Sequence, residues 1–387
     1  MSRNLKVAII GAGMGGLSAA SALRQRGIEV HVYERAMMLG EVGAGLQLGP
    51  NSYRVFRALG LEETFRQNAF EPINNVSLKW DDASVRFREP MRGPMIERFG
   101  APYMTAHRGD LHRILRETLP EDTFHLGKIC TGAENHGEAA VAHFADGTSV
   151  EADVIIGADG IRSAIRAQHF GADKPRWTEQ MAWRCIVPVD CVPKAFGPNK
   201  TTSIARNEYF GWLGPDGHVI CYPIGNGDML NIFAGHVSID WVEESWSAAS
   251  TKEELIAGYA GWNEALLEIY SNVTHVFKWG IFDRDPVPEW QTGRICLLGD
   301  AAHPTMPTLA QGANMAIEDG WVLGHCLDNS RDDPGAGLRA FVRQRQPRTA
   351  RVTLTSRQQF ANNRMVPPPP PIDRSWIFDY DVTTEAA

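Results

Sequence analysis

Glycines near the start of the chain are spaced as in loops that hold a phosphate group. Three of them form the pattern G-x-G-x-x-G: Gly11, Gly13 and Gly16. Glycines there allow a tight turn and a close approach of the backbone to a pyrophosphate, which lies at the positive end of the following helix; Met14 is inside this loop. Glu34, followed by Arg35, stands eighteen residues after the last glycine, where an acid accepts hydrogen bonds from ribose hydroxyls. These residues predict a site for an adenine dinucleotide, without saying which one.

A strand, a helix and a second strand are needed to position this loop. Lys6–Ile10 is an apolar run, Gly15–Arg26 has apolar residues at helical spacing, and Glu29–Glu34 alternates as a strand does. Together they have the size of a parallel βαβ crossover. The expected fold class is therefore α/β, with a Rossmann-like lobe.

Four further stretches, far apart in the chain, combine glycines with polar residues. The candidate cofactor-binding residues in them are Gly45, Gln47, Arg108, Asp159, Asp300, Pro307, Gly312 and Ala313. Dehydrogenases that use NAD usually complete the nucleotide site within one contiguous domain. Segments from the whole chain instead imply a long ligand with a polar chain in its middle, and FAD is such a ligand. The glycine-rich stretch Gly225–Gly235 lacks a following helix, so NADH or NADPH is expected to bind only transiently.

The chain is expected to form two lobes and a C-terminal extension. Residues 1–75, 100–180 and 280–330 are expected to make a discontinuous FAD-binding lobe, because the buried parallel-type strands lie there. Residues 76–99 and 181–279 are expected to make an inserted substrate lobe with a mixed or antiparallel sheet, because short alternating runs are separated by turns. Residues 331–387 hold a C-terminal helix and a proline-rich tail.

Composition argues against several classes of protein. The net charge of −8 disfavours a nucleic-acid binder, and no window of eighteen apolar residues indicates a membrane span. The six cysteines show no metal-binding spacing and are interpreted as reduced core thiols, so no metal is expected. The basic and then apolar N-terminus would suit a signal peptide, but its glycine turn favours folded structure, and a cytoplasmic location is expected.

Seven arginines and no acid occur between Gly335 and Ile372. This imbalance is interpreted as a solvated helix face packed beside an acidic lobe, in preference to a patch for an anionic partner. The oligomeric state is left open between a monomer and a homodimer.

Three motifs, "GAGMGG", "GADGIRS" and "GDAAHP", occur in an order and spacing that resemble one family over nearly the whole chain. The chain is similar to the FAD-dependent aromatic hydroxylases, the single-component flavoprotein monooxygenases that include salicylate hydroxylase, 3-hydroxybenzoate 6-hydroxylase and 6-hydroxynicotinate 3-monooxygenase. The resemblance implies non-covalent FAD, with NADH or NADPH and O2 as co-substrates. It also implies hydroxylation of a hydroxylated aromatic or heteroaromatic carboxylate through a flavin C4a-hydroperoxide.

The same resemblance implies roles for the cofactor-binding residues. Asp300 would accept hydrogen bonds from the ribityl chain, and Pro307 would stiffen the loop beside the flavin ring. The helix that begins at Gly312 and Ala313 would direct its positive end at the flavin, where negative charge gathers on reduction. Asp159 and Arg108 match family positions that contact FAD, and a structural hydrogen bond is the expected role of His303.

His218 and Tyr222 are the candidate catalytic residues. They lie four positions apart in "GHVICYPI", so on a strand both side chains point to one face. His218 would act as a base or hydrogen-bond partner for a phenol, and Tyr222 as a partner for a carboxylate or hydroxyl. The alternative is a polar pair on a solvated face of the sheet. Arg184 would reach a substrate carboxylate or form an ion pair within the sheet.

The substrate is left at the level of a class. Hydroxynicotinate enzymes carry histidines where this chain has Gln47 and Thr308, "MPTLAQGA" is closer to salicylate-type hydroxylases, and "WIFDYD" resembles the tails of hydroxynicotinate and hydroxybenzoate enzymes. The alternative activities are an FAD-dependent oxidase or dehydrogenase of another small substrate, and a flavin-binding sensor or scaffold without turnover.

Overall fold

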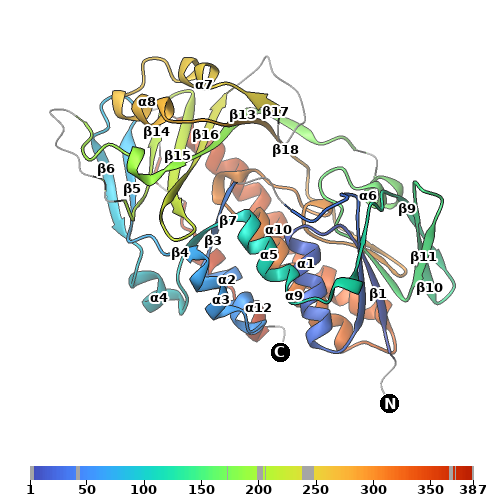
Figure 1. Cartoon of the computed structure of the whole chain (residues 1–387). Helices are drawn as coiled ribbons and strands as arrows, with labels where there is room; N and C mark the ends of the chain where they lie inside the picture. Colours follow the sequence, from blue (N-terminus) through green and yellow to red (C-terminus); the bar gives the residue numbers. More distant parts are fainter. Residues whose placement is uncertain are drawn as a thin grey trace.

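The first strand, helix and strand form the unit that the sequence predicts. The computed structural model describes residues 4–40, 44–171, 173–197, 204, 206–237, 248–365, 369–370 and 372–385. Strand β1 (Lys6–Ile10) pairs in parallel with β2 (Glu29–Glu34), and α1 (Met14–Gln25) connects them. The helix begins one residue earlier than expected, directly after Gly13, so the glycine loop opens straight into it (Figure 1).

A six-stranded sheet is built around this unit. Its order is β19 (Gln291–Thr292), β20 (Ile295–Leu297), β12 (Val154–Gly157), β1, β2 and β8 (Phe124–Leu126). All neighbours except β19 and β20 run in parallel. The carboxyl ends of β1, β2, β12 and β20 therefore share one edge, where ligands bind in sheets of this type. This arrangement brings together the loops that contain the three distant motifs.

Close packing of two helices places the last motif beside the first. Helix α9 (Gly312–Asp328) lies along α1, and a Cβ added at Gly320 would stand 2.5 Å from the backbone nitrogen of Ala19. The Ser18 hydroxyl donates to the carbonyl of Ile317 at 3.0 Å. Small residues at the crossing let the two backbones approach, which fixes the start of α9 near the glycine loop.

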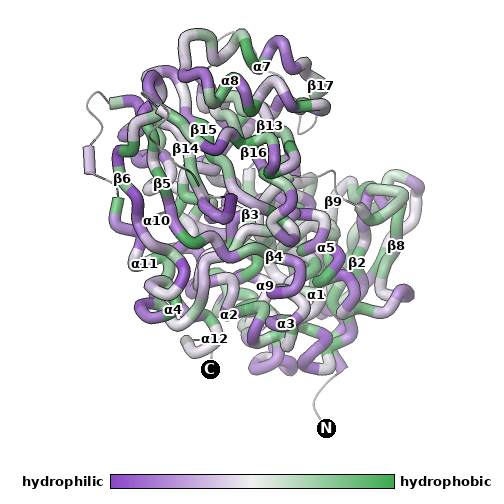
Figure 2. Tube along the Cα trace, turned by 60° about the vertical axis from the view of Figure 1, so that its left-hand side comes forward, coloured by the Kyte–Doolittle hydropathy of each residue, from purple (hydrophilic) through white to green (hydrophobic). Residues whose placement is uncertain are grey.

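The second large sheet has eight strands. Its order is β17 (Ala248–Ser250), β18 (Val276–Asp283), β13 (Arg176–Pro188), β16 (Met229–Val237), β15 (Gly217–Ile224), β14 (Tyr209–Leu213), β5 (Asn74–Lys79) and β6 (Val85–Pro90). Only β14 and β5 pair in parallel, so the sheet is mixed, as expected. Figure 2 shows β13 to β16 in a part of the molecule separate from β2 and β8. The lobe boundaries at the residue numbers given above stay a prediction.

The two faces of this sheet have different surroundings. Side chains such as Trp212, Cys221 and Ile232 point to an outer core, which α7 (Lys252–Gly258) and α8 (Glu264–Ser271) cover. Alternate residues on the same strands, including His218 and Tyr222, point to the opposite face. We call this opposite face the inner face of the sheet.

Two small sheets and a set of short helices complete the fold. One sheet has the order β3 (Gly45–Leu48), β7 (Met104–His107) and β4 (Ala69–Phe70), and the other has β9 (Cys130–His136), β10 (Ala139–Phe144) and β11 (Ser149–Ala152). The first joins the lobes, because the backbone N–H of Gly45 donates to Asn231 Oδ1 at 2.6 Å. The helices are α2 (Pro50–Ala58), α3 (Glu62–Gln67), α4 (Pro94–Phe99), α5 (Arg108–Arg116) and α6 (Ala164–His169).

Two arginines of helix α10 (Pro334–Asn363) are not on a solvated face, contrary to the interpretation made from the sequence. Arg345 has no exposed area, and it pairs with Glu318 at 2.6 Å and with Asp319 at 2.7 Å. Arg348 is buried as well and pairs with Glu318 at 2.8 Å. A solvated face is therefore wrong for these two residues, since they neutralise acids of α9 inside the protein.

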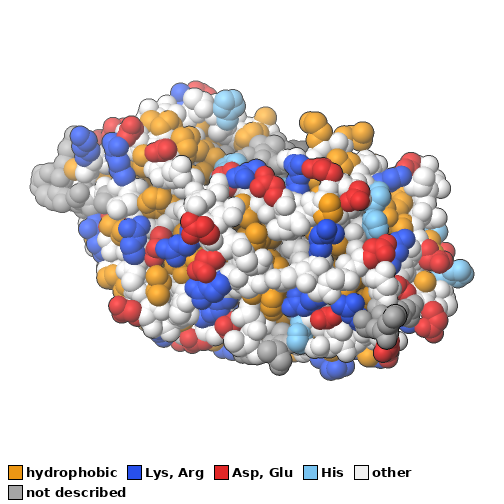
Figure 3. All heavy atoms as spheres, turned by 60° about the horizontal axis from the view of Figure 1, so that its bottom comes forward, with side chains coloured by type: hydrophobic (Ala, Val, Ile, Leu, Met, Phe, Trp, Pro, Cys, Tyr) orange, Lys and Arg blue, Asp and Glu red, His pale blue; other side chains and the backbone are white. Residues whose placement is uncertain are grey.

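The chain ends in α11 (Ser375–Phe378) and α12 (Val382–Glu385). The proline-rich tail lies partly outside the described residues. No helix in the described part of the chain is long and apolar enough to cross a membrane. On the face that Figure 3 shows, acidic and basic side chains are interspersed.

Candidate active site

The glycine loop has room for a ligand at one position only. Gly11 has a φ of +110°, and a Cβ there would lie 2.3 Å from the carbonyl oxygen of Ala158. A Cβ at Gly16 would lie 2.0 Å from the carbonyl oxygen of Gly11, whereas one at Gly13 would meet nothing within 4 Å. No side chain caps α1, so the N–H groups from Met14 onward are available to a phosphate.

Glu34 stands beside this loop, as the sequence predicts. Its carboxylate accepts hydrogen bonds from the backbone N–H groups of Ala12, at 2.8 Å, and Ala36, at 2.9 Å. Arg35 is exposed next to it. Behind the loop, the buried His112 ring lies 2.8 Å from the carbonyl oxygen of Ala12 through Nε2. Glu34 therefore lies at the end of β2, as expected, and hydrogen bonds from the backbone of Ala12 and Ala36 orient its carboxylate.

Asp159 offers a carboxylate oxygen to the shared edge of the sheet. Its Oδ2 accepts from the N–H of Ala164 at 2.9 Å, while Oδ1 is buried without a partner. Burial raises the pKa of Asp159. A buried acceptor without a donor is costly, and a ligand hydroxyl would satisfy it.

Asp300 follows β20 at the same edge. Burial raises its pKa, and the neighbouring side chains of His303 and Arg108 oppose that shift. Arg108 begins α5, and its backbone N–H donates to the carbonyl of Ala44 at 2.8 Å. Asp300 and Arg108, which are far apart in the sequence, are thus close enough to interact electrostatically.

His303 has a structural partner, which agrees with the role expected for it. Its Nε2 lies 2.6 Å from Asp319 Oδ2, and Asp319 also accepts from the N–H of Gly299 at 3.1 Å. Burial alone would raise the pKa of Asp319, but His303 and Arg345 hold it down at about 2. The charged acid therefore anchors the loop that carries Asp300 to helix α9.

The start of α9 is open to a ligand. The side chain of Gln311 makes no cap, so the N–H groups of Gly312 and Ala313 have no side-chain partner. A Cβ at Gly312 would meet only Thr305, at 3.8 Å. Pro307 begins the short 3-10 helix Pro307–Leu309, which stiffens the preceding loop. An uncapped helix start of this kind stabilises negative charge in front of it.

The inner face of the sheet presents both candidate catalytic residues. His218 is 9% exposed and Tyr222 is 3% exposed, so the alternative of a solvated polar pair is wrong. Burial lowers the pKa of His218 to about 4. Burial raises the pKa of Tyr222, whose ring stacks on Tyr209 with a centroid distance of 5.9 Å. At neutral pH the inner face therefore carries a neutral imidazole and protonated phenols.

Three tyrosine hydroxyls gather around one amide, and we call this group the tyrosine cluster: Tyr103, Tyr209 and Tyr222 with Gln47. The Tyr103 hydroxyl donates to Gln47 Oε1 at 2.7 Å, and burial raises the pKa of Tyr209 and Tyr222, a shift that the nearby Gln47 side chain opposes in both. The cluster lies where β3 and β7 meet the inner face. Gln47 thus connects β3 to the inner face of the second sheet.

Three comparisons agree on the relationship of this chain to known proteins. The family described as FAD binding domain matches residues 4–356. The 3-amino-4-hydroxybenzoate 2-monooxygenase of Streptomyces platensis is 39% identical over 97% of this chain and 96% of its own. The 6-hydroxynicotinate 3-monooxygenase of Pseudomonas fluorescens is 35% identical over 99% and 96%. A salicylate hydroxylase substrate complex has a TM-score of 0.82 at 25% identity, covering 99% of this chain and 97% of that one.

The chain belongs to the FAD-dependent aromatic hydroxylases. Its cofactor is FAD, and the open position at Gly13, the unpartnered oxygen of Asp159 and the uncapped start of α9 fit that group. The family and the fold class predicted from the motifs are therefore confirmed. Nothing in the comparisons supports the oxidase alternative.

Sequence reasoning missed two members of the tyrosine cluster, Tyr103 and Tyr209. Tyr209 lies directly opposite Tyr222, since β14 and β15 pair around the turn between Leu213 and His218. The turn "GPDG" fixes that register and would have revealed Tyr209. Tyr103 had no such indication, because it precedes β7 of the small sheet, which does not pair with β14 or β15. Arg184 lies with its guanidinium 5.2 Å from the ring centroid of Trp279, near enough to Tyr222 to affect it electrostatically.

Proposed function

We propose that this hydroxylase adds a hydroxyl group to the ring of a hydroxylated aromatic or heteroaromatic carboxylate, with NADH or NADPH as transient co-substrate. The names of the relatives support this class, because they act on an aminohydroxybenzoate and a hydroxynicotinate. Bound FAD would supply the redox chemistry, namely acceptance of a hydride from the nicotinamide and transfer of one atom of O2 to the ring, with the other atom released as water.

The arrangement of His218 and Tyr222 is the observation on which this proposal rests. Both side chains are buried on the inner face, and Ile220 stands between them on β15. Four residues of a strand span about 13 Å, a separation that one substituted ring with a polar group at each end would bridge. A ring in that position would have a polar partner at each end, as a hydroxyaryl acid requires.

His218 has the protonation state that a base needs. Its pKa of about 4 keeps the imidazole neutral at physiological pH, so a ring nitrogen can accept a hydrogen bond from the substrate phenol and take its proton as oxygen adds to the ring and the phenol becomes acidic. A phenolate ring is the better acceptor of an electrophilic oxygen. Tyr222, with a raised pKa, stays protonated and donates a hydrogen bond to the other end of the substrate.

The cofactor-binding residues are proposed to divide the FAD molecule among them. Gly11, Gly13, Met14 and Gly16 would hold the pyrophosphate, and Glu34 with Arg35 the adenosine end. Asp159, Asp300 and Arg108 would hold the ribityl chain. Those that would lie along the flavin are Gly45, Gln47, Pro307, Gly312 and Ala313. The cytoplasmic location, the monomeric or homodimeric state and the lobe boundaries are further proposals.

A turnover screen tests the proposed function. Purified protein with bound FAD is mixed with NADH or NADPH and a panel of hydroxybenzoates, aminohydroxybenzoates and hydroxypyridine carboxylates. We expect at least one acid to accelerate nicotinamide oxidation strongly and to yield a hydroxylated product by mass. Equal oxidation rates with and without every acid would reject the proposal.

A further inference from the structure

The C-terminal segment, residues 372–385, is held against α2 and α10 by two arginines. Arg54 Nη1 donates to the carbonyls of Phe378, at 2.7 Å, and Tyr380, at 3.1 Å. Arg348 Nη2 donates to the carbonyl of Ile377 at 3.0 Å, and its guanidinium lies 3.9 Å from the ring centroid of Tyr380. The segment is therefore a fixed part of the fold.

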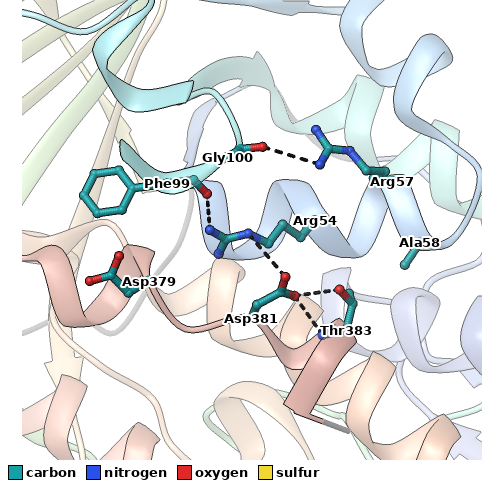
Figure 4. A pocket seen from close by; sticks show the side chains of 8 residues that line it. All are labelled: Arg54, Arg57, Ala58, Phe99, Gly100, Asp379, Asp381 and Thr383. Carbon is teal, nitrogen blue, oxygen red and sulfur yellow. Dashed lines mark hydrogen bonds and ion pairs between the residues drawn. The ribbon is translucent and has the colours of Figure 1, made fainter. Parts of the chain in front are cut away.

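Figure 4 shows the side of the C-terminal segment that faces α2 and the end of α4. A groove of about 510 Å³ lies there between α2, the end of α4 and the C-terminal segment. Arg54 spans it from the Phe99 carbonyl to Asp381, which also accepts hydrogen bonds from Thr383. The polar groups of the groove bind each other, so it serves to hold the segment and we assign it no ligand.

The opposite side of the segment meets the tyrosine cluster. The ring of Phe378 lies edge-on to that of Tyr103, with centroids 6.0 Å apart. The carbonyl of Arg374 accepts from the N–H of Ile377 at 2.9 Å, so the start of α11 fixes the position of this residue. Burial raises the pKa of Tyr103 and Tyr209, and the positive charge of Arg374 counteracts that shift in both. Arg374 lies one helical turn before Phe378, since the N–H of Phe378 donates to its carbonyl at 3.3 Å, and it is therefore at the end of the segment that meets Tyr103, within electrostatic range of both hydroxyls.

Arg374 has no acidic partner within the described part of the chain. It is partly buried, and the carboxylate beside it is occupied, because Asp373 accepts from the N–H of Ser375 at 2.9 Å and from its hydroxyl at 2.5 Å. Elsewhere in the protein, buried arginines such as Arg345 are matched by acids. A partly buried cation within electrostatic range of the Tyr103 and Tyr209 hydroxyls is a donor suited to an anion.

We propose that Arg374, supplied by the C-terminal segment, recognises the carboxylate of the aromatic substrate. This inference rests on the proposed function. With the phenol of the substrate at His218, the far end of the ring reaches Tyr222 and thus the tyrosine cluster. The hydroxyls of the cluster and the guanidinium of Arg374 then bind the carboxylate together. Arg374 determines specificity, since it separates acids from uncharged rings of the same shape.

The test compares an acid with its amide. In the full-length FAD-loaded enzyme, Arg374→Met is assayed with the fastest acid of the panel and with the corresponding amide; for 3-amino-4-hydroxybenzoate the amide is 3-amino-4-hydroxybenzamide. We expect KM and the Kd from flavin absorbance to rise about 10- to 100-fold for the acid, because a charge-assisted contact is lost, and less than about 2-fold for the amide. Arg374→Lys should restore part of the loss. The matched control is Arg364→Met, in an exposed arginine beyond the end of α10.

Two results would overturn the inference while the proposed function stands. One is normal binding of the acid by Arg374→Met in an enzyme that hydroxylates it. The other is an equal loss for acid and amide, which would show a structural role; Arg184→Met, tested in parallel, would then show whether that arginine binds the carboxylate. If the wild type neither binds nor hydroxylates any acid of the panel, the proposed function fails, and this inference fails with it.

Discussion

His218→Asn should separate oxygen activation from ring hydroxylation. The variant keeps a polar side chain on the inner face but removes the group that accepts the phenol proton. Loss of a positioned base typically costs about 100- to 10,000-fold in rate. We therefore expect hydroxylation to fall by that order, while substrate-stimulated oxidation of NADH or NADPH continues and releases peroxide. The experiment measures how much hydroxylated product and how much peroxide form for each molecule of NADH or NADPH oxidised.

The lowered pKa of His218 predicts how hydroxylation should depend on pH. A histidine at its ordinary value of 6.5 would be about one-tenth neutral at pH 5.5, whereas one at about 4 is almost entirely neutral there. Hydroxylation by the wild type should therefore not decline between pH 7.5 and 5.5 on account of His218.

The lowered pKa of His218 also predicts how protein stability depends on pH, which can be measured without turnover. The unfolded chain takes up a proton near pH 6.5, but the folded chain does so only near 4, so stability is lost as the pH falls through this window. Once the folded and the unfolded chain both bind this proton, the free energy of unfolding is lower by about 3 kcal/mol. His218→Asn should flatten this part of the profile of unfolding free energy against pH, measured by denaturant titration.

A matched control is available on the neighbouring strand. His236 lies on the outer face of the same sheet, against Trp183 and Tyr259. His236→Asn should leave the ratio of product to nicotinamide unchanged. Wild-type coupling in His218→Asn, or an equal loss of coupling in both variants, would refute the assignment of His218 as the base.

Four shorter predictions test the rest of the site. Tyr222→Phe should lower kcat/KM by about 5- to 100-fold with FAD content unchanged, since one buried hydrogen bond is lost, and steady-state kinetics would show this. Asp300→Ala should weaken FAD retention, measured as flavin per chain after gel filtration. Gly16→Ala should yield protein that does not retain FAD, because the added Cβ would stand 2.0 Å from the Gly11 carbonyl oxygen. Arg345→Met should lower stability by about 3–5 kcal/mol in denaturant titration, because Glu318 loses one of its buried partners and Asp319 loses its paired guanidinium.

The candidate cofactor-binding residues could be predicted because a pyrophosphate and a ribose each require a particular local backbone geometry. A glycine loop between a strand and a helix, and an acid at the end of the next strand, are needed for a pyrophosphate and a ribose whatever surrounds them. Gly11, Gly16 and Glu34 accordingly lie where the sequence indicates. Even Asp300, near the far end of the chain, was recognisable, because it ends a buried strand and precedes a helix.

The substrate half was less predictable because it is assembled by tertiary contacts. Tyr103 reaches Gln47 from the residue before β7, and Arg374 comes from the C-terminal segment, with no spacing in the sequence that links them to the inner face. The burial of Arg345 was missed for a related reason. An arginine-rich helix predicts exposure, and only its packing against the acids of α9 reverses that expectation.

The central claim is that the loops at the edge of the first sheet and the inner face of the second act on one flavin and one aromatic acid. Turnover of the FAD-loaded wild type under ¹⁸O2, with the fastest acid of the panel and NADH or NADPH, tests it most directly by mass spectrometry of the product. The account predicts one labelled oxygen atom, bound to a ring carbon. An unlabelled product, or peroxide as the only product with every acid, would contradict it.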